Sequence, residues 1–207
     1  MKFLSLILVL LLTSCATPVK KQKELLISKN ICCNSMVEFD YKSMAISEAV
    51  TLKFNEKSPV YDFGYGKTYF SALTLPLDIE APYINVKSYF NGSLIGQYFD
   101  PIFLVLNEKH ERIKEFSLRL RFRDVNMFTN PNANMAGVFK FPEGAKYLII
   151  FTRNFNNEAP VAELAASTSM VMVGNAPMVF SNQGESIQLE RSPTGSIQLE
   201  LLDQDGS

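Results

Sequence analysis

Residues 83–90 have the sequence YINVKSYF, and this alternation of apolar and polar side chains decides the fold class. Ile84, Val86 and Phe90 fall on one side of an extended chain, because successive side chains of a β-strand point to opposite faces of the sheet. Residues 116–123, FSLRLRFR, repeat the pattern with Phe and Leu alternating against Ser and Arg. A period of two, rather than the 3.6 of a helix, predicts half-buried strands in both places.

Two further runs, residues 102–106 and 147–151, are apolar without alternation, which indicates strands buried on both faces. Clusters of Gly, Pro and Asn separate these segments. Many short strands with turn signals between them predict an all-β fold. We expect an antiparallel β-sandwich, jelly-roll-like, formed as one domain by residues 31–202. One short helical segment is expected at residues 158–172.

The C-terminal part of the sandwich contains a short repeat. The sequence SIQLE occurs at residues 186–190 and again at residues 196–200, with RSPTG between the two copies. Each copy places Ile and Leu on one face, and a five-residue loop containing Pro and Gly fits a β-hairpin. The repeat therefore predicts that the two copies pair with each other. Residues 203–207 are expected to be a disordered tail.

Residues 1–14 have the form of an export signal. Lys2 is followed by an apolar run of about half the roughly 20 residues that a transmembrane helix needs. The next residues, 12–15, are LTSC and resemble the lipobox of bacterial lipoproteins, in which small residues flank the cleavage site and the Cys is lipidated. We therefore expect cleavage after residue 14 and acyl chains, such as palmitate, on Cys15. The alternative is an ordinary signal peptide with Cys15 in this place by coincidence.

Lipidation would anchor the protein in a membrane through its N-terminus. Ala16, rather than Asp, follows the Cys, and this pattern implies sorting to the bacterial outer membrane, with the domain facing the periplasm. Residues 15–30 are polar and Lys-rich, so we expect a lipid anchor and a flexible tether that spans at most roughly 50 Å. Its lysines are either simply solvated or in contact with anionic headgroups.

The composition argues against catalysis. The chain has 207 residues, a net charge of −1, one His and no Trp. Near-neutrality provides no overall field that would attract nucleic acid. His110 lies in a charged loop and is the single candidate for a His-based triad, while residues 64–68, GYGKT, lack the first Gly of a phosphate-binding loop. We expect no enzyme activity, cofactor or metal; a hydrolase would need carboxylates that converge in a cleft.

Cys32 and Cys33 are adjacent, and a periplasmic location would be oxidising. If Cys15 carries lipid, these two cysteines have only each other as partners within the chain. The sequence therefore makes them a candidate vicinal disulfide, with buried or free thiols as the alternative.

Two groups of side chains are candidates for a binding surface. Tyr61, Tyr65 and Tyr69 are spaced so that they could form an aromatic platform for a sugar, although the same spacing describes the core face of a strand. Arg119, Arg121 and Arg123 share one face of a predicted strand. That face is either a solvated or charge-protected edge, or a contact surface for anionic lipid or a partner protein.

The order of these segments resembles the maltose-operon periplasmic protein family, the MalM-like proteins. The resemblance covers most of residues 31–202 and rests on Cys32-Cys33 and on the following short motifs: FGYGKTYF at 63–70, LTLP at 73–76, FDPIFLVL at 99–106, YLIIFT at 147–152 and GSIQLEL at 195–201. It implies a β-rich periplasmic protein associated with maltose or maltodextrin uptake, with no established enzymatic activity. The lipobox and the shortened tether are departures from the family pattern.

These observations predict a non-catalytic accessory lipoprotein linked to carbohydrate transport, with an oligosaccharide as ligand. The alternative is a structural or assembly lipoprotein that docks an envelope protein complex. The shape of the molecule distinguishes the two, because a concave site lined by exposed Tyr favours a ligand, whereas a flat patch favours a protein partner.

Overall fold

The computed structural model describes most of the chain between residues 17 and 202. The described residues are 17–46, 48–76, 83–91, 97–123, 132–153, 162–163, 167–173, 176–182, 186–187 and 190–202, with the backbone alone described between 162 and 187. The predicted signal peptide, Cys15 and the predicted tail at 203–207 lie outside this range.

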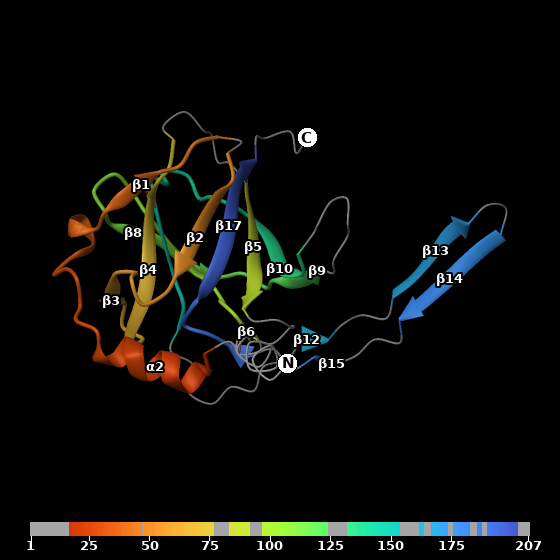
Figure 1. Ribbon diagram of the computed structural model, residues 1–207. Helices are drawn as coiled ribbons and strands as arrows, with labels where there is room; N and C mark the ends of the chain where they lie inside the picture. The colour runs from red at the N-terminus through yellow and green to blue at the C-terminus, as the bar shows by residue number, and fades with distance from the viewer. Residues whose placement is uncertain are drawn as a thin grey trace, which may run out of the picture.

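Two β-sheets form the body of the molecule (Figure 1). Sheet A has the order β1 (Tyr41–Ser43), β4 (Lys67–Thr74), β11 (Tyr147–Phe151), β7 (Ile102–Leu106), β8 (Arg112–Ser117), with β3 (Val60–Asp62) paired to β4. Sheet B has the order β2 (Val50–Phe54), β17 (Gly195–Leu202), β5 (Tyr83–Asn91), β10 (Asn134–Lys140), β9 (Arg121–Arg123), with β6 (Gln97–Tyr98) beside the end of β5 and β16 (Glu190–Arg191) beside β6.

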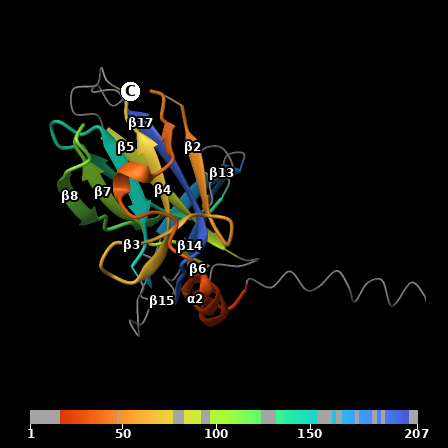
Figure 2. The same cartoon turned by 90° about the vertical axis from the view of Figure 1, so that its left-hand side faces the viewer.

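The pairings are antiparallel except for β1 with β4 and β16 with β6. Figure 2 shows the two sheets as stacked layers. The predicted all-β sandwich is therefore confirmed.

Sheet A carries apolar side chains on both faces. The face toward sheet B contributes Leu73, Phe103 and Ile150 to the main core, and the other face carries a second apolar cluster that includes Leu104 and Ile149. Every residue of β7 is buried. This arrangement confirms that residues 102–106 and 147–151 lack alternation because both of their faces are covered.

The N-terminal segment folds differently from the sequence-based expectation. A flexible arm was predicted over residues 15–30, but Val19–Ser28 forms helix α2, which lies across the lower end of the sandwich in Figure 1. Val19, Gln22 and Leu26 are its buried residues, a spacing that places them on one helix face. This narrow stripe, one member of which is polar, is hidden in the sequence by the surrounding lysines. No helix among the described residues is long and apolar enough to cross a membrane.

The predicted helix at residues 158–172 is wrong at 162–163 and 167–172, the positions within it that the structure describes. β12 (Ala162–Glu163) pairs with β15 (Ser186–Ile187), and β13 (Ser167–Val173) forms an antiparallel hairpin with β14 (Ala176–Asn182). The sequence STSMVMV of β13 contains the β-branched residues that favour strands, and cross-strand pairing outweighs the modest helical preference upstream. In Figure 1 the β13–β14 hairpin extends away from the sandwich.

Two pairing predictions also differ from the structure. The SIQLE copies do not pair: the second lies in β17, between β2 and β5, while the first is divided between β15 and β16. Residues 116–123 are not one strand, because β8 belongs to sheet A and β9 to sheet B. The chain crosses between the sheets at residues 118–120, where Leu118 and Leu120 pack against the main core. Local alternation shows which side chains are apolar, but it does not show which sheet receives them.

Candidate functional site

The strand register of sheet B brings distant side chains together on its outer face, the side turned away from sheet A. On β17, Ile197, Leu199 and Leu201 are buried, so the alternate residues point outward. The pairings align these outward residues in rows across the sheet. One row is Lys53, Ser196, Tyr89, Asn134 and Arg123, and the next is Thr51, Gln198, Lys87, Ala136 and Arg121. Glu200, Asn85 and Val138 form a third row, and Leu202, Tyr83 and Lys140 a fourth.

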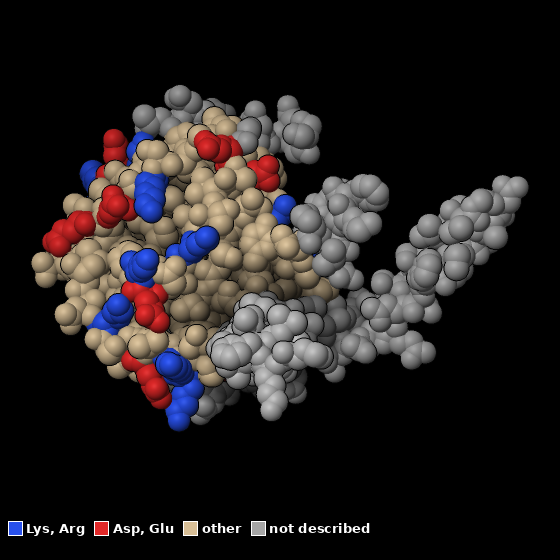
Figure 3. All heavy atoms as spheres, viewed as in Figure 1, with Lys and Arg blue, Asp and Glu red and all other residues tan. Residues whose placement is uncertain are grey.

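This outer face of sheet B is locally basic, although the whole chain has a net charge of −1. Its cations are Lys53, Lys87, Lys140, Arg121 and Arg123. Among the outward positions of the five aligned strands, Glu200 is the carboxylate. Lys87 and Arg121 lie in one row two strands apart, which corresponds to about 10 Å between their backbones. In Figure 3, acidic and basic groups are interspersed over the left and lower left of the surface, and further acidic groups lie at the top.

Uncharged side chains lie among the cations on this face. The Tyr89 hydroxyl donates a hydrogen bond of 2.9 Å to Gln198 Oε1 on the neighbouring strand. The Lys140 ammonium lies 5.7 Å from the centre of the Tyr83 ring, and Val138, in the neighbouring row, is 55% exposed. An exposed aliphatic side chain among cations suits a broad partner surface better than an enclosed small molecule.

The three predicted arginines all have exposed side chains. Arg121 and Arg123 lie on β9, at the end of sheet B in the described part of the chain, whereas Arg119 lies in the connection before it. Sequence reasoning missed the lysines of β2, β5 and β10 that share this face. Their outward positions follow from local alternation, but their closeness to β9 depends on pairings between distant segments.

The three predicted tyrosines do not form one platform. Tyr69 is completely buried in the core between the sheets. Tyr61 is half-buried on the opposite side of sheet A, where its ring packs edge-on against Phe39 and Phe63. Tyr65 alone of the three is exposed, at 42%. The described structure therefore offers no aromatic surface built from this group.

Tyr65 occupies a tight turn whose geometry is explained by its neighbours. Asp62 Oδ1 accepts hydrogen bonds from the backbone N–H groups of Gly64 (2.8 Å) and Gly66 (3.1 Å), and both glycines have positive φ. The Tyr65 hydroxyl donates to Glu115 Oε1 at 2.7 Å, and this hydrogen bond raises the pKa of Tyr65. The Arg153 guanidinium lies 5.0 Å from the ring centre. Lys67 and Thr68, the last two residues of the GYGKT segment, already belong to β4.

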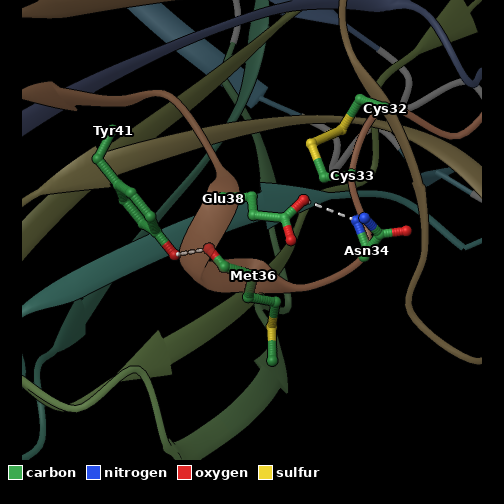
Figure 4. Close-up of a disulfide and its surroundings, with 6 residues drawn as sticks. All are labelled: Cys32, Cys33, Asn34, Met36, Glu38 and Tyr41. Carbon is green, nitrogen blue, oxygen red and sulfur yellow. Dashed lines mark hydrogen bonds between the residues drawn. A yellow bond between two sulfur atoms is a disulfide. The ribbon is translucent and has the colours of Figure 1, made fainter.

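The structure joins Cys32 and Cys33 in a vicinal disulfide (Figure 4). The backbone N–H of Cys32 donates to Val60 O at 2.9 Å, and Cys33 packs against the second apolar cluster on sheet A. Nearby, the Asn34 N–H donates to Glu38 Oε2 and the Tyr41 hydroxyl donates to Met36 O, each at 2.9 Å. The disulfide thus belongs to a segment that covers this face of sheet A.

A buried amide holds α2 against the sandwich. The Gln22 side chain is 6% exposed, and its Nε2 donates to Thr17 O (2.6 Å) and to Gln97 Oε1 on β6 (3.0 Å). Its Oε1 accepts hydrogen bonds from the hydroxyls of Ser192 and Thr194. This network connects the start of α2 to β6 and to the connection between β16 and β17. Thr17 is therefore part of the folded domain.

A small pocket lies where α2 meets the ends of β4, β11 and β16. Its lining consists of Lys23, Leu26, Lys67, Thr68, Thr152, Arg153, Arg191, Ser192 and Pro193. The cavity volume of about 10 Å³ accommodates roughly one water molecule. The pocket is thus too small for a sugar ring, but its four basic residues make it a candidate site for an anionic group.

No protein-family model, curated protein or solved structure matches the chain. The resemblance to the MalM-like family stays a prediction.

Within the described residues, no group of three or more His, Cys, Asp and Glu side chains could hold a metal ion. His110 lies in the turn between β7 and β8, and its ring stacks on Tyr147.

Proposed function

We propose that the protein is an accessory lipoprotein on the periplasmic side of the outer membrane, anchored through Cys15. In this proposal it acts by docking an acidic surface of another envelope protein onto the outer face of sheet B, and not by catalysis. The observation that carries the proposal is the strand register, which aligns the cations of β2, β5, β10 and β9 on one face of sheet B, with Glu200 as the one carboxylate among the aligned, described positions.

The chemistry of this face specifies the partner. Aligned ammonium and guanidinium groups attract carboxylates and orient an approaching acidic surface. Val138 and Tyr83 lie among these cations, and apolar side chains of the partner can cover them. This burial contributes binding free energy, whereas solvent-exposed charge pairs at the edge of an interface contribute little.

The carbohydrate role implied by the family resemblance has less support. Stacking on sugar rings would require exposed aromatic faces, but Tyr69 is in the core, Tyr61 is half-buried and the Tyr65 ring contacts Arg153. The docking role is therefore the one proposed.

Site-specific photocrosslinking in cells tests the docking role. A photoreactive amino acid replaces Val138 in the outer face of sheet B, and in a second strain it replaces Ile113, an exposed aliphatic residue of β8 in sheet A. We expect a discrete adduct with one envelope protein from position 138 and none from position 113. Equal adducts from both positions, or no adduct from position 138, would contradict the proposal.

A further inference from the structure

We propose that the basic pocket beneath α2 binds a phosphate group of an anionic lipid headgroup in the membrane that holds the anchor. This inference rests on the proposed lipidation of Cys15. It assigns a second role to the N-terminal helix: besides connecting the domain to its anchor, α2 completes a lipid site. The pocket is separate from the outer face of sheet B and uses different residues.

The pocket has the chemistry of a phosphate site. Lys23, Lys67, Arg153 and Arg191 contribute positive charge from four different segments. Part of that charge is already used: Arg191 Nε forms an ion pair with Asp100 Oδ2 at 2.9 Å, and the Lys67 ammonium donates to the carbonyl oxygens of Ile27 and Lys29. These contacts hold the Lys67 and Arg191 side chains in position. These two cations are therefore arranged before any ligand binds.

A buried hydroxyl gives a second, independent indication of a ligand. Thr152 lines the pocket and is 3% exposed, and its Oγ1 has no hydrogen-bond partner within the described part of the chain. A buried polar atom without a partner costs free energy, and such atoms are rare in folded proteins. A phosphate oxygen in the pocket would accept a hydrogen bond from this hydroxyl while its charge is balanced by the surrounding cations.

The size of the pocket indicates how the ligand is held. A volume of about 10 Å³ admits one oxygen atom but not a whole headgroup. The phosphate would therefore place one oxygen inside and leave its ester groups outside, as a lipid at a bilayer surface requires. Arg153 is exposed and its guanidinium lies 5.0 Å from the centre of the Tyr65 ring. A guanidinium can form paired hydrogen bonds to the phosphate oxygens that stay outside the pocket.

The distance to the anchor places this pocket at the membrane. Thr17 O is fixed by Gln22, and Cys15 precedes Thr17 by two residues, which extend over at most about 7 Å. Lys23 lies four residues beyond the start of α2, about 6 Å along the helix axis. The interfacial region of a bilayer leaflet is itself about 5–7 Å thick. A lipidated Cys15 would hold the pocket within reach of headgroup phosphates.

Hydrogen–deuterium exchange tests this site on the full mature lipoprotein in nanodiscs. One sample contains phosphatidylcholine alone, a second adds phosphatidylglycerol, and a third adds inorganic phosphate to phosphatidylcholine. We expect amides of Val19–Ser28 and Glu190–Arg191 to exchange at least threefold more slowly in the second sample than in the first. Replacing two of the pocket cations, Lys23→Gln with Arg153→Gln, should abolish the difference. The matched pair Lys42→Gln with Lys57→Gln, on exposed lysines outside the pocket lining, should keep it.

Equal exchange in the first two samples, or slowing that survives Lys23→Gln with Arg153→Gln, would overturn the site. Slowing by inorganic phosphate but not by phosphatidylglycerol would show a site for a soluble anion and overturn the lipid assignment. Mass spectrometry of the same sample reports acyl chains on Cys15; their absence would overturn both the anchor and this site, whereas acylation without slowing would overturn this site alone.

Discussion

Gln22 holds the N-terminal segment against the sandwich, where the sequence predicts a flexible tether. A glutamine among lysines gives no signal of burial, yet its amide makes hydrogen bonds to the backbone of Thr17 and to side chains on two other segments. Such a group is stabilising only while all its partners are present, because an unpaired buried partner is costly.

Replacing Gln22 with Ala should therefore lower the free energy of unfolding by about 1–3 kcal/mol, since the hydroxyls of Ser192 and Thr194 lose their acceptor. Urea denaturation measures the change. Lys21→Ala, on the exposed side of the same helix, is the control and should stay within about 0.5 kcal/mol. A Gln22→Ala midpoint equal to that of Lys21→Ala would show that the amide network contributes nothing.

Tyr65 gives a prediction about pH. Its hydrogen bond to Glu115 raises its pKa above the ordinary value of 10.0. A group whose pKa is raised by folding stabilises the protein below its unfolded pKa, and this contribution is lost as the pH rises through the folded pKa. The difference in unfolding free energy between the native chain and Glu115→Gln should be present at neutral pH and should shrink above pH 10. Urea denaturation over a pH series, with the ¹³Cζ shift of Tyr65, measures it. A difference that grows with pH would contradict this account.

At the scale of elements, the sequence was sufficient where one strand could be judged alone. β5 follows from alternation, and β7 and β11 follow from unbroken apolar runs, because sheet A is covered on both faces. α2 could not be predicted in the same way, because only three of its residues are buried and one of them is the polar Gln22. The partner of β17 also could not be predicted, since identical SIQLE copies carry no information about which distant strand each will meet.

The start of β17 gives a test of this long-range pairing. A Cβ at Gly195 would lie 2.7 Å from Phe99 Cβ and 3.3 Å from Phe99 N, and Phe99 is itself fully buried and stacked on Phe54. Gly195→Ala should therefore lower the free energy of unfolding by about 1–3 kcal/mol. Urea denaturation measures the loss.

Gly137→Ala provides the comparison for that variant. Its Cβ would meet the end of the flexible Leu120 side chain at 3.1 Å, so the neighbour can move aside and the cost should be smaller. If Gly195→Ala were as stable as the native chain, β17 would not begin against Phe99 as described.

At the scale of the whole molecule, two basic regions have different positions and different proposed ligands. The pocket beneath α2 is close in sequence to the proposed lipid anchor, whereas the outer face of sheet B is the broad surface of one layer of the sandwich. The net charge of −1 conceals both, because composition averages over surfaces that folding separates. The three arginines near β9 were predicted from sequence, but only the register shows that lysines of β2, β5 and β10 join them.

The measurement that tests the central claim most directly is the crosslink from position 138 in a chain with two reversed charges on the same row, Lys87→Glu with Arg121→Glu. Both side chains point outward, so the sandwich should keep its stability, which thermal unfolding checks. The adduct should be lost in this variant and retained in the matched reversal Lys42→Glu with Lys57→Glu, at exposed lysines outside this face. An adduct of undiminished yield in the Lys87→Glu, Arg121→Glu chain would contradict a basic docking face on sheet B.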